Sequence, residues 1–324
     1  MGGMRQNAGR CGARGLILCL ASVAVLAGCS INRLAVRAVT GVLTGGGGSG
    51  AFGRDDDPEL VASALPFALK LYESLLDADP KNPALLLATG SAFTMYAYAF
   101  IQTPADLLPD DQIDRQASEI ARARKLLLRA REYIFRALEL KYPGRFMSYV
   151  KHQLTEGVDL VKELSFVERS DADYLYWAAA SWMAAVSAAQ FDMSLIVTVP
   201  KAIAMVRKIL SWDDAYGAGS AHDLLVSYYG SGIDPDPNWK QRAREHYERA
   251  IQLSGGNKAG MYLSYAMAVA VADQDVESFK ALIGKALAVD LSAAPDSRLE
   301  NVIAQRRARW LLANIDKYFL LEEE

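Results

Sequence analysis

The sequence predicts an all-α protein built as an array of paired antiparallel helices. Three observations lead to this prediction. Apolar residues recur with a period near 3.6 from Pro58 onward, and proline or glycine interrupts that pattern at intervals of about 12 to 27 residues. One spacing of small and bulky residues also returns in every second predicted helix. No segment alternates apolar and polar residues as a half-buried strand would.

Residues 1–28 have the features of a signal peptide. The arginines Arg5, Arg10 and Arg14 precede a short apolar stretch, Gly15 to Ala27, which is too short to span a membrane. That stretch ends in Leu26-Ala27-Gly28-Cys29, which resembles the lipobox of bacterial lipoproteins. The sequence therefore predicts cleavage before Cys29 and acylation of its thiol, with acyl chains (palmitate among them) as the membrane anchor.

The cysteine content and the next residues complete this prediction. Cys11 and Cys19 lie inside the removed segment, so the mature chain keeps no thiol pair for a disulfide or a zinc site. In a Gram-negative cell, Ser30 in place of Asp favours sorting to the outer membrane, on its periplasmic side. The run Gly45–Gly50 is typical of a flexible linker. We therefore expect an acylated tether over residues 29–54 and one helical domain over residues 55–324.

The charge balance argues against nucleic acid as a partner. The whole chain has 35 basic and 38 acidic residues, and removal of the three signal-peptide arginines changes its net charge from −3 to about −6. Charges of both signs are interspersed, so no basic face is expected. The only predicted link to a membrane is the lipid anchor.

The first predicted helix begins after an acidic run, Asp55-Asp56-Asp57, followed by Pro58. These acids could form a calcium or catalytic cluster, but acidic residues and proline are also what the first turn of a helix favours. We interpret the run as a helix cap. Later breaks fall at the proline and glycine clusters near residues 80–83, 104–109, 143–144, 198–200, 234–238, 255–257 and 295–296.

The recurring spacing places a small residue, a bulky residue four positions later, and another small or apolar residue three positions after that. It is seen in Ala68-Tyr72-Leu75, Ala130-Ile134-Ala137, Ala202-Val206-Ile209, Ala243-Tyr247-Ala250 and Phe279-Ile283-Ala286. In tetratricopeptide repeats, such small residues let two helices approach closely. The intervals between successive copies are irregular. The sequence therefore predicts a cryptic tetratricopeptide-like array, with Gly90 at a close approach between helices.

Several strings of residues then resemble one family, the T-components of tripartite ATP-independent periplasmic (TRAP) transporters. They are Asp55–Leu76, Tyr96–Gln102, Leu175–Trp177, Arg242–Ala250 and Ala304–Leu312. The resemblance implies an envelope lipoprotein that forms a homotrimer. It also implies binding to the periplasmic solute-binding P-component and handling of a hydrophobic or organic-acid ligand. His222-Asp223 departs from the His-Glu pair expected at that place.

Catalysis is not expected. The sequence contains three histidines, His152, His222 and His246, and lacks HExxH and GxSxG motifs, so neither a metal nor a cofactor is predicted. His222 and Asp223 are adjacent, and adjacent helix positions point about 100° apart, so the two side chains should not face each other. Glu245-His246 has charged neighbours and looks like a solvated helix face.

Aromatic residues are the better candidates for a binding surface, because many fall on the predicted first helices of repeats, which line the concave face of a helical array. Most of them should belong to the core. We select Tyr98, Tyr176, Trp177 and His222 as candidate ligand- or pore-lining residues. The favoured function is a lipid-anchored accessory protein of a TRAP uptake system. The alternative is a generic tetratricopeptide-like scaffold lipoprotein of another envelope assembly.

Overall fold

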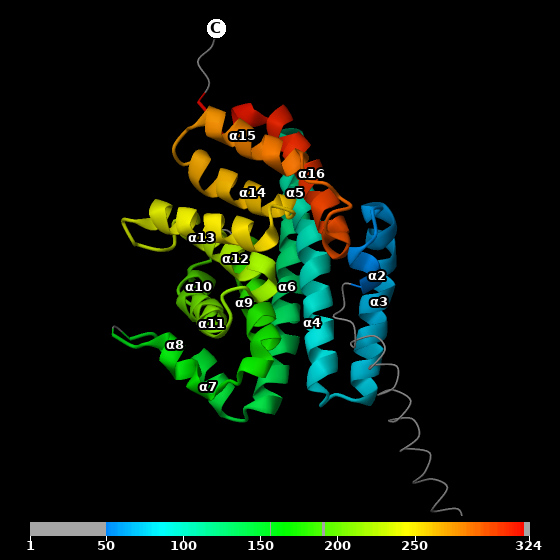
Figure 1. The fold of residues 1–324 in the computed structure, drawn as a ribbon. Helices are drawn as coiled ribbons and strands as arrows, with labels where there is room; N and C mark the ends of the chain where they lie inside the picture. The colour runs from blue at the N-terminus through cyan, green and yellow to red at the C-terminus, as the bar shows by residue number, and fades with distance from the viewer. Residues whose placement is uncertain (1–49, 156, 190–191, 321–324) are drawn as a thin grey trace, which may run out of the picture.

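A computed structural model describes residues 50–155, 157–189 and 192–320, and every regular element in these ranges is a helix (Figure 1). The predicted all-α class is therefore confirmed. The signal peptide, Cys29 and most of the predicted tether lie in residues 1–49, outside the described residues.

The elements follow one another with short connections. The first half contains α2 (Gly50–Gly53), α3 (Pro58–Ala78), α4 (Pro83–Ala97), the π-helix η1 (Tyr98–Gln102), α5 (Thr103–Asp106), α6 (Ile113–Lys141), α7 (Arg145–Lys151), α8 (Leu160–Glu163) and α9 (Ala172–Ser187). The second half contains α10 (Met193–Ile196), α11 (Val199–Trp212), α12 (Ser220–Tyr229), α13 (Trp239–Ser254), α14 (Ala259–Tyr265), the π-helix η6 (Ala266–Ala270), α15 (Val276–Leu287) and α16 (Arg298–Ala313).

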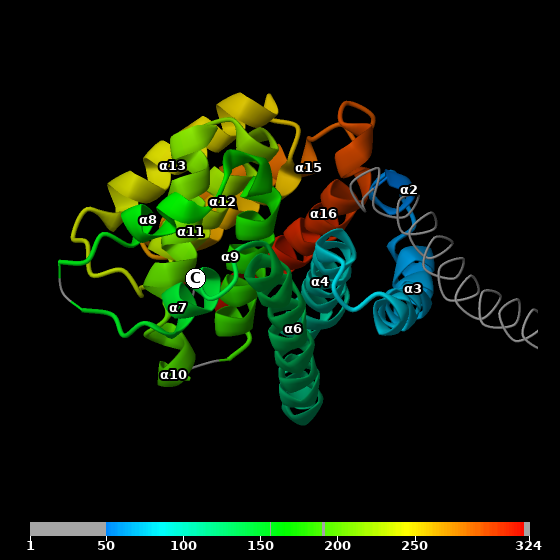
Figure 2. The ribbon, with the colours of Figure 1, turned by 90° about the horizontal axis from the view of Figure 1, so that it is seen from below.

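The long helix α6 forms the spine of the molecule. It packs against α4 on one side and α9 on the other, and α3 covers the outer side of α4 (Figures 1 and 2). Beyond α9, the chain continues through α11, the α12–α13 pair and the α14–α15 pair. The last helix, α16, returns to contact α2 and α3, so the two ends of the described chain meet.

Side-chain caps start several of these helices. The Asp57 carboxylate accepts a hydrogen bond from the Leu60 backbone N–H at 2.9 Å, as the helix-cap interpretation of the acidic run requires. The Asn82 side chain caps α4 in the same way, through the Leu85 N–H at 3.1 Å. In both helices a proline occupies the first position, where its missing N–H costs no hydrogen bond.

The segment Pro83–Asp106 is the one described helix long and apolar enough, by length and composition alone, to cross a membrane. It is the central helix α4 with its continuation, and it packs between α3, α6 and α9. At Gly90 a Cβ atom would lie 2.8 Å from the Ala130 carbonyl oxygen and closer still to Ile134. Gly90 therefore marks the close approach of α4 and α6, as its place in the sequence predicts.

The recurring spacing marks buried faces in four of its five copies. Ala130, Ala202 and Ala243 are all fully buried, as are most of their partners in the pattern. The first copy is out of register, because Leu65, Leu69 and Leu76 form the buried face of α3, whereas Ala68 and the residues paired with it are half-buried. The cryptic repeat array stays a prediction.

The end of the predicted tether differs from expectation, since Gly50–Gly53 forms the short helix α2. Phe52 packs against the Val61–Leu65 cluster, and Arg54 forms an ion pair with Asp296 at 2.9 Å. These contacts hold residues 50–54, the last part of the predicted tether, against α3 and α16.

Candidate functional site

The four candidate residues do not form one group. Tyr176 and Trp177 lie together on α9, with ring centroids 5.5 Å apart. His222 is buried on α12 and contacts α13. Tyr98 is 44% exposed on η1, and within the described ranges no hydrogen bond or ring contact joins it to the other three. Among the described residues, the direct contacts therefore join Tyr176 to Trp177 alone, and the shared binding surface stays a prediction.

Tyr176 instead belongs to an aromatic group at the base of α12. Its ring lies 5.2 Å from that of Tyr216, whose hydroxyl donates a hydrogen bond to Asp173 at 2.6 Å. Tyr216 stands on the Tyr216–Gly219 turn, where Gly219 adopts a positive φ of 91°. A Cβ at Gly219 would lie 2.8 Å from the Ala250 carbonyl oxygen, so glycine allows this turn to approach α13.

Polar side chains from four segments converge beside this aromatic group, and we call them the Asp223 cluster: Tyr176, Ser220, Asp223, Lys258, Ser264 and Glu300. The Lys258 ammonium, at the start of α14, donates hydrogen bonds to Ser220 Oγ at 2.8 Å and to the Gly217 carbonyl at 3.1 Å. Asn301 of α16 fixes the same region, because its amide bonds to Ala259 N at 2.8 Å and to Asn257 O at 2.9 Å.

Burial dominates the electrostatics of this cluster. It raises the pKa of Asp223 to about 6, against the opposing effects of the Ser264 hydroxyl and the Lys258 charge, while the Glu300 charge raises the pKa further. Burial likewise raises the pKa of Tyr176, with Glu300 and Asp223 contributing. Asp223 Oδ1 has no hydrogen-bond partner among the described residues. Such a group is costly to fold and is a candidate for ligand binding.

His222 and Asp223 face different neighbours, as their adjacent positions predict. His222 Nε2 donates to the Asp214 carbonyl at 3.1 Å, so in the neutral ring Nδ1 accepts, and it lies 2.8 Å from His246 Nδ1. The His246 ring in turn stacks on Tyr229. Burial, followed by the His222 charge, lowers the pKa of His246 to about 4. The prediction of a solvated face holds for Glu245, which is exposed, but His246 is half-buried, because it contacts His222 of α12 and stacks on Tyr229.

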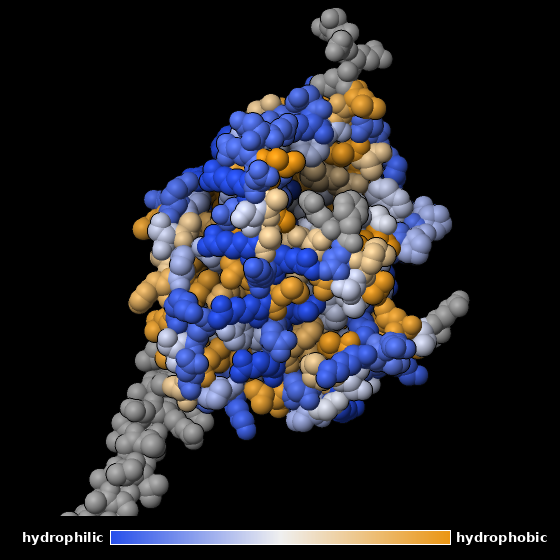
Figure 3. All heavy atoms as spheres, turned by 180° about the vertical axis from the view of Figure 1, so that it is seen from behind, coloured by the Kyte–Doolittle hydropathy of each residue, from blue (hydrophilic) through white to orange (hydrophobic). Residues whose placement is uncertain are grey.

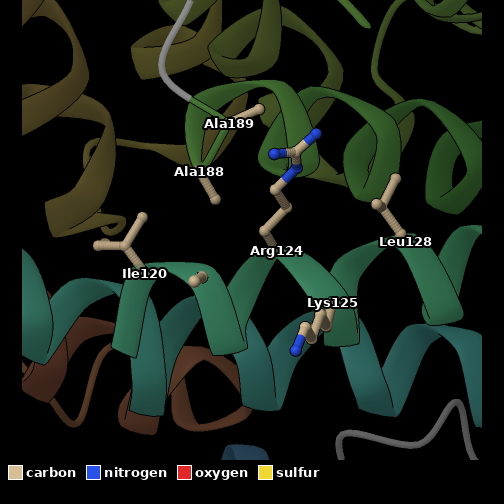
Figure 4. Close-up of a pocket in the computed structure, with 7 residues that line it drawn as sticks. Ile120, Arg124, Lys125, Leu128, Ala188 and Ala189 are labelled. Carbon is tan, nitrogen blue, oxygen red and sulfur yellow. The ribbon is translucent and has the colours of Figure 1, made fainter. Parts of the chain in front are cut away.

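A concavity lies elsewhere, between α6 and the end of α9, and we call it the α6–α9 groove (Figure 4). It encloses about 370 Å³, within the range of small-molecule sites. Its lining is apolar apart from two cations: Ile120, Ala121, Arg124, Lys125, Leu128, Ala188 and Ala189. In Figure 4 Arg124 extends from α6 toward Ala189.

The sequence contains little signal for either site. Ser220, Asp223, Lys258 and Glu300 are spread over 81 residues and meet only through the packing of α12, α14 and α16. Arg124 and Leu128 share a face of α6, but that helix is rich in basic residues along its length. No cluster of three or more histidine, cysteine, aspartate or glutamate residues suited to a metal occurs in the described part of the chain.

Comparison with known proteins assigns the family. The family model described as TRAP transporter T-component matches residues 54–319. An uncharacterized protein of Treponema pallidum (strain Nichols) is 31% identical over 314 residues, which cover 93% of this chain and 96% of that protein. An all-helical body of this length with this match defines a class of transport accessory proteins. The chain belongs to the TRAP transporter T-component family, and it is thereby a transporter component associated with the cell envelope.

Proposed function

We propose that this protein is a lipid-anchored accessory component of a TRAP uptake system, on the periplasmic side of the outer membrane. It binds the solute-binding P-component and handles a hydrophobic or organic-acid ligand. The observation that carries this proposal is the family match over residues 54–319, which spans nearly the whole described body. The lack of a catalytic motif in the sequence supports a binding role.

The exposed face of α3 offers a surface for the P-component. Leu60, Phe67 and Leu71 are 58%, 76% and 40% exposed, and their spacing places them on one side of the helix. Elsewhere the surface is mixed, and Figure 3 shows hydrophilic and hydrophobic residues interspersed over the face it presents. Exposed apolar residues that follow one helix are typical of a protein contact.

The test is a pull-down in which residues 50–324 serve as bait for a TRAP solute-binding P-component from the same organism. We expect wild-type protein to retain it, Phe67→Glu to lose most of the binding, and Ile113→Glu, at an isolated exposed position, to bind as wild type. Failure of the wild-type protein to retain the P-component would favour the alternative, a generic scaffold lipoprotein. If Phe67→Glu keeps this binding but breaks a trimer measured by sedimentation, the α3 face is the self-association surface instead.

The ligand site that we propose combines Tyr176 and Trp177 with the Asp223 cluster, while Tyr98 and His222 remain secondary candidates. Aromatic rings beside an unpartnered carboxylate oxygen offer both apolar contact and a polar recognition point. Alanine variants at the four positions, each checked for folding, should separate these roles in ligand titrations. Wild-type affinity in folded Tyr176→Ala and Trp177→Ala would remove this site.

The anchor is tested independently at Cys29. Cys29→Ala removes the acyl acceptor, so we expect an unprocessed or mislocalised precursor in fractionated cells. A shorter, acylated species that still fractionates with membranes would contradict the lipoprotein assignment.

A further inference from the structure

The Asp223 cluster carries negative charge that its own lysine does not neutralise. Asp223 and Glu300 supply two carboxylates, and within the described ranges neither forms an ion pair. The Lys258 ammonium donates its hydrogen bonds elsewhere, to the Gly217 carbonyl and to Ser220 Oγ. Asp223 Oδ1 is buried and has no hydrogen-bond partner among the described residues. A carboxylate in this state is costly unless a cation or another donor completes its surroundings.

The packing of α14 between α12 and α16 brings the two carboxylates near each other. Ser264 of α14 forms a hydrogen bond with the Asp223 carboxylate. One turn earlier on the same helix, a Cβ built on Gly260 would lie 3.9 Å from Glu300 Oε1. The Asn301 side chain accepts a hydrogen bond from the first backbone N–H of α14 at 2.8 Å, which holds the start of α16 against this turn. Asp223 and Glu300 therefore approach the same face of α14, and Glu300 is exposed, so the site is open to solvent.

Three aromatic rings, those of Tyr176, Trp177 and Tyr216, lie beside these carboxylates. Each ring packs on the core with one side and keeps part of its surface exposed. Lysine and arginine side chains lie over rings elsewhere, as Lys141 does at 5.2 Å from the Tyr174 centroid, but among the described residues none lies over these three. The face of an aromatic ring is negative and attracts a cation. The rings and the carboxylates thus favour the same kind of ligand group.

We propose that the Asp223 cluster binds the ammonium group of a hydrophobic amine. The ammonium lies between the carboxylates of Asp223 and Glu300, and the apolar body of the amine packs against Tyr176 and Trp177. Ammonium donors form charge-assisted hydrogen bonds to carboxylates, and the rings add cation–π attraction. An organic acid would meet two like charges at the same position, so the site selects against it. This inference rests on the proposed ligand site and names the class of ligand that the site takes.

The experiment is calorimetric titration of the full chain at pH 8 with three probes that share a phenyl ring and differ in charge. They are phenethylammonium chloride, phenethyl alcohol and sodium hydrocinnamate. We expect the ammonium probe to bind about tenfold or more tightly than the other two. Asp223→Asn keeps the size of the side chain and removes its charge, so it should weaken ammonium binding by about tenfold and leave alcohol binding unchanged. Asp111→Asn, at an exposed position, is the matched control and should bind as wild type.

Urea unfolding of the same variant separates a binding role from damage to the fold, because Asp223→Asn should lose affinity while it gains stability at this pH. Three outcomes would overturn the assignment: no binding of the ammonium probe by wild-type protein, equal binding of the three probes, or unchanged affinity in Asp223→Asn. Preferred binding of hydrocinnamate that is lost in folded Trp177→Ala would overturn it as well, but would leave the proposed ligand site in place. A pull-down of the P-component by Asp223→Asn reports separately on the proposed function.

Discussion

Asp223 and His246 show how burial acts on single titratable residues in this fold. Both are held away from their charged forms, one at the junction of α12 with α14 and α16, the other between α12 and α13. The resulting changes with pH have opposite signs. Acidification protonates Asp223 more readily in the folded than in the unfolded chain, and it protonates His246 less readily.

We expect Asp223→Asn to stabilise the protein at neutral pH. The folded pKa of Asp223 is raised to about 6 from 3.8, so its ionised form is disfavoured above pH 6 and the folded state gains stability as pH falls toward 4. At pH 8 the free energy of unfolding of the variant should exceed that of wild type by about 1 to 3 kcal/mol. This difference should shrink as the pH falls toward 4. Urea unfolding across this range measures it, with Asp111→Asn as an exposed control. A destabilised Asp223→Asn at pH 8 would contradict the assigned burial.

His246→Asn tests the opposite sign. Because the folded pKa of His246 is lowered to about 4 from 6.5, the unfolded chain binds the proton first, and wild-type stability falls as pH drops from 6.5 to 4. Asparagine keeps a side-chain donor for His222 but does not titrate. Between pH 7 and pH 4.5 the free energy of unfolding should therefore fall by about 1 to 3 kcal/mol less in the variant than in wild type. The comparison is made in the Asp223→Asn background, with His246 and with His246→Asn, because Asp223 would otherwise change the stability in the opposite direction as the pH falls. Identical pH profiles would show that His246 is solvated after all.

The candidate residues show that the sequence predicts the direction of a side chain on its helix but not the residues that it contacts. Helix geometry alone correctly separated the directions of His222 and Asp223. It could not show what each side chain faces, since His246 and Glu300 are 24 and 77 residues away. The charged neighbours of His246 indicated solvent, but the packing of α12 on α13 decides its burial. Long-range packing of this kind carries no local signal.

At the scale of elements, the approach of α4 to α6 depends on one missing side chain. Gly90→Ala would place a Cβ 2.8 Å from a backbone oxygen of α6 and against Ile134, and a helix backbone cannot shift as cheaply as a side chain. We expect a loss of roughly 1 to 3 kcal/mol from overpacking, although alanine favours the helix itself. Chemical unfolding measures this change.

Gly284→Ala is the control for that change. Gly284 also lies inside a helix, α15, but nothing lies within 4 Å of a Cβ built there. The same substitution should therefore stabilise by about 0.5 to 1 kcal/mol through helix propensity alone. Equal effects at the two glycines would mean that Gly90 does not mark a close approach.

At the scale of the whole molecule, the sequence predicted the helices better than their arrangement. The 3.6-residue period of apolar residues and the capping residues indicated the helices. Capping side chains such as Asp57 and Asn82 give a local signal, because each bonds to a backbone N–H three residues later. The return of α16 onto α2 and α3 had no such signal, since it joins residues about 240 apart in the chain. The short helix α2 follows from that return, because Arg54 and Phe52 find their partners only there.

The junction between the two ends of the chain combines charge with apolar packing, and the two contributions can be separated. Arg306 pairs with Glu59 through its two terminal guanidinium nitrogens, but the pair is exposed and screened by salt. Leu299, also on α16, packs against the cluster around Val61. Leu299→Ala should therefore cost about 1 to 2 kcal/mol at any salt concentration, whereas Arg306→Gln should lower the melting temperature slightly, and only at low salt. Thermal unfolding at low and high sodium chloride compares them. If Arg306→Gln costs more than Leu299→Ala in high salt, the charged pair rather than the apolar contact holds the ends together.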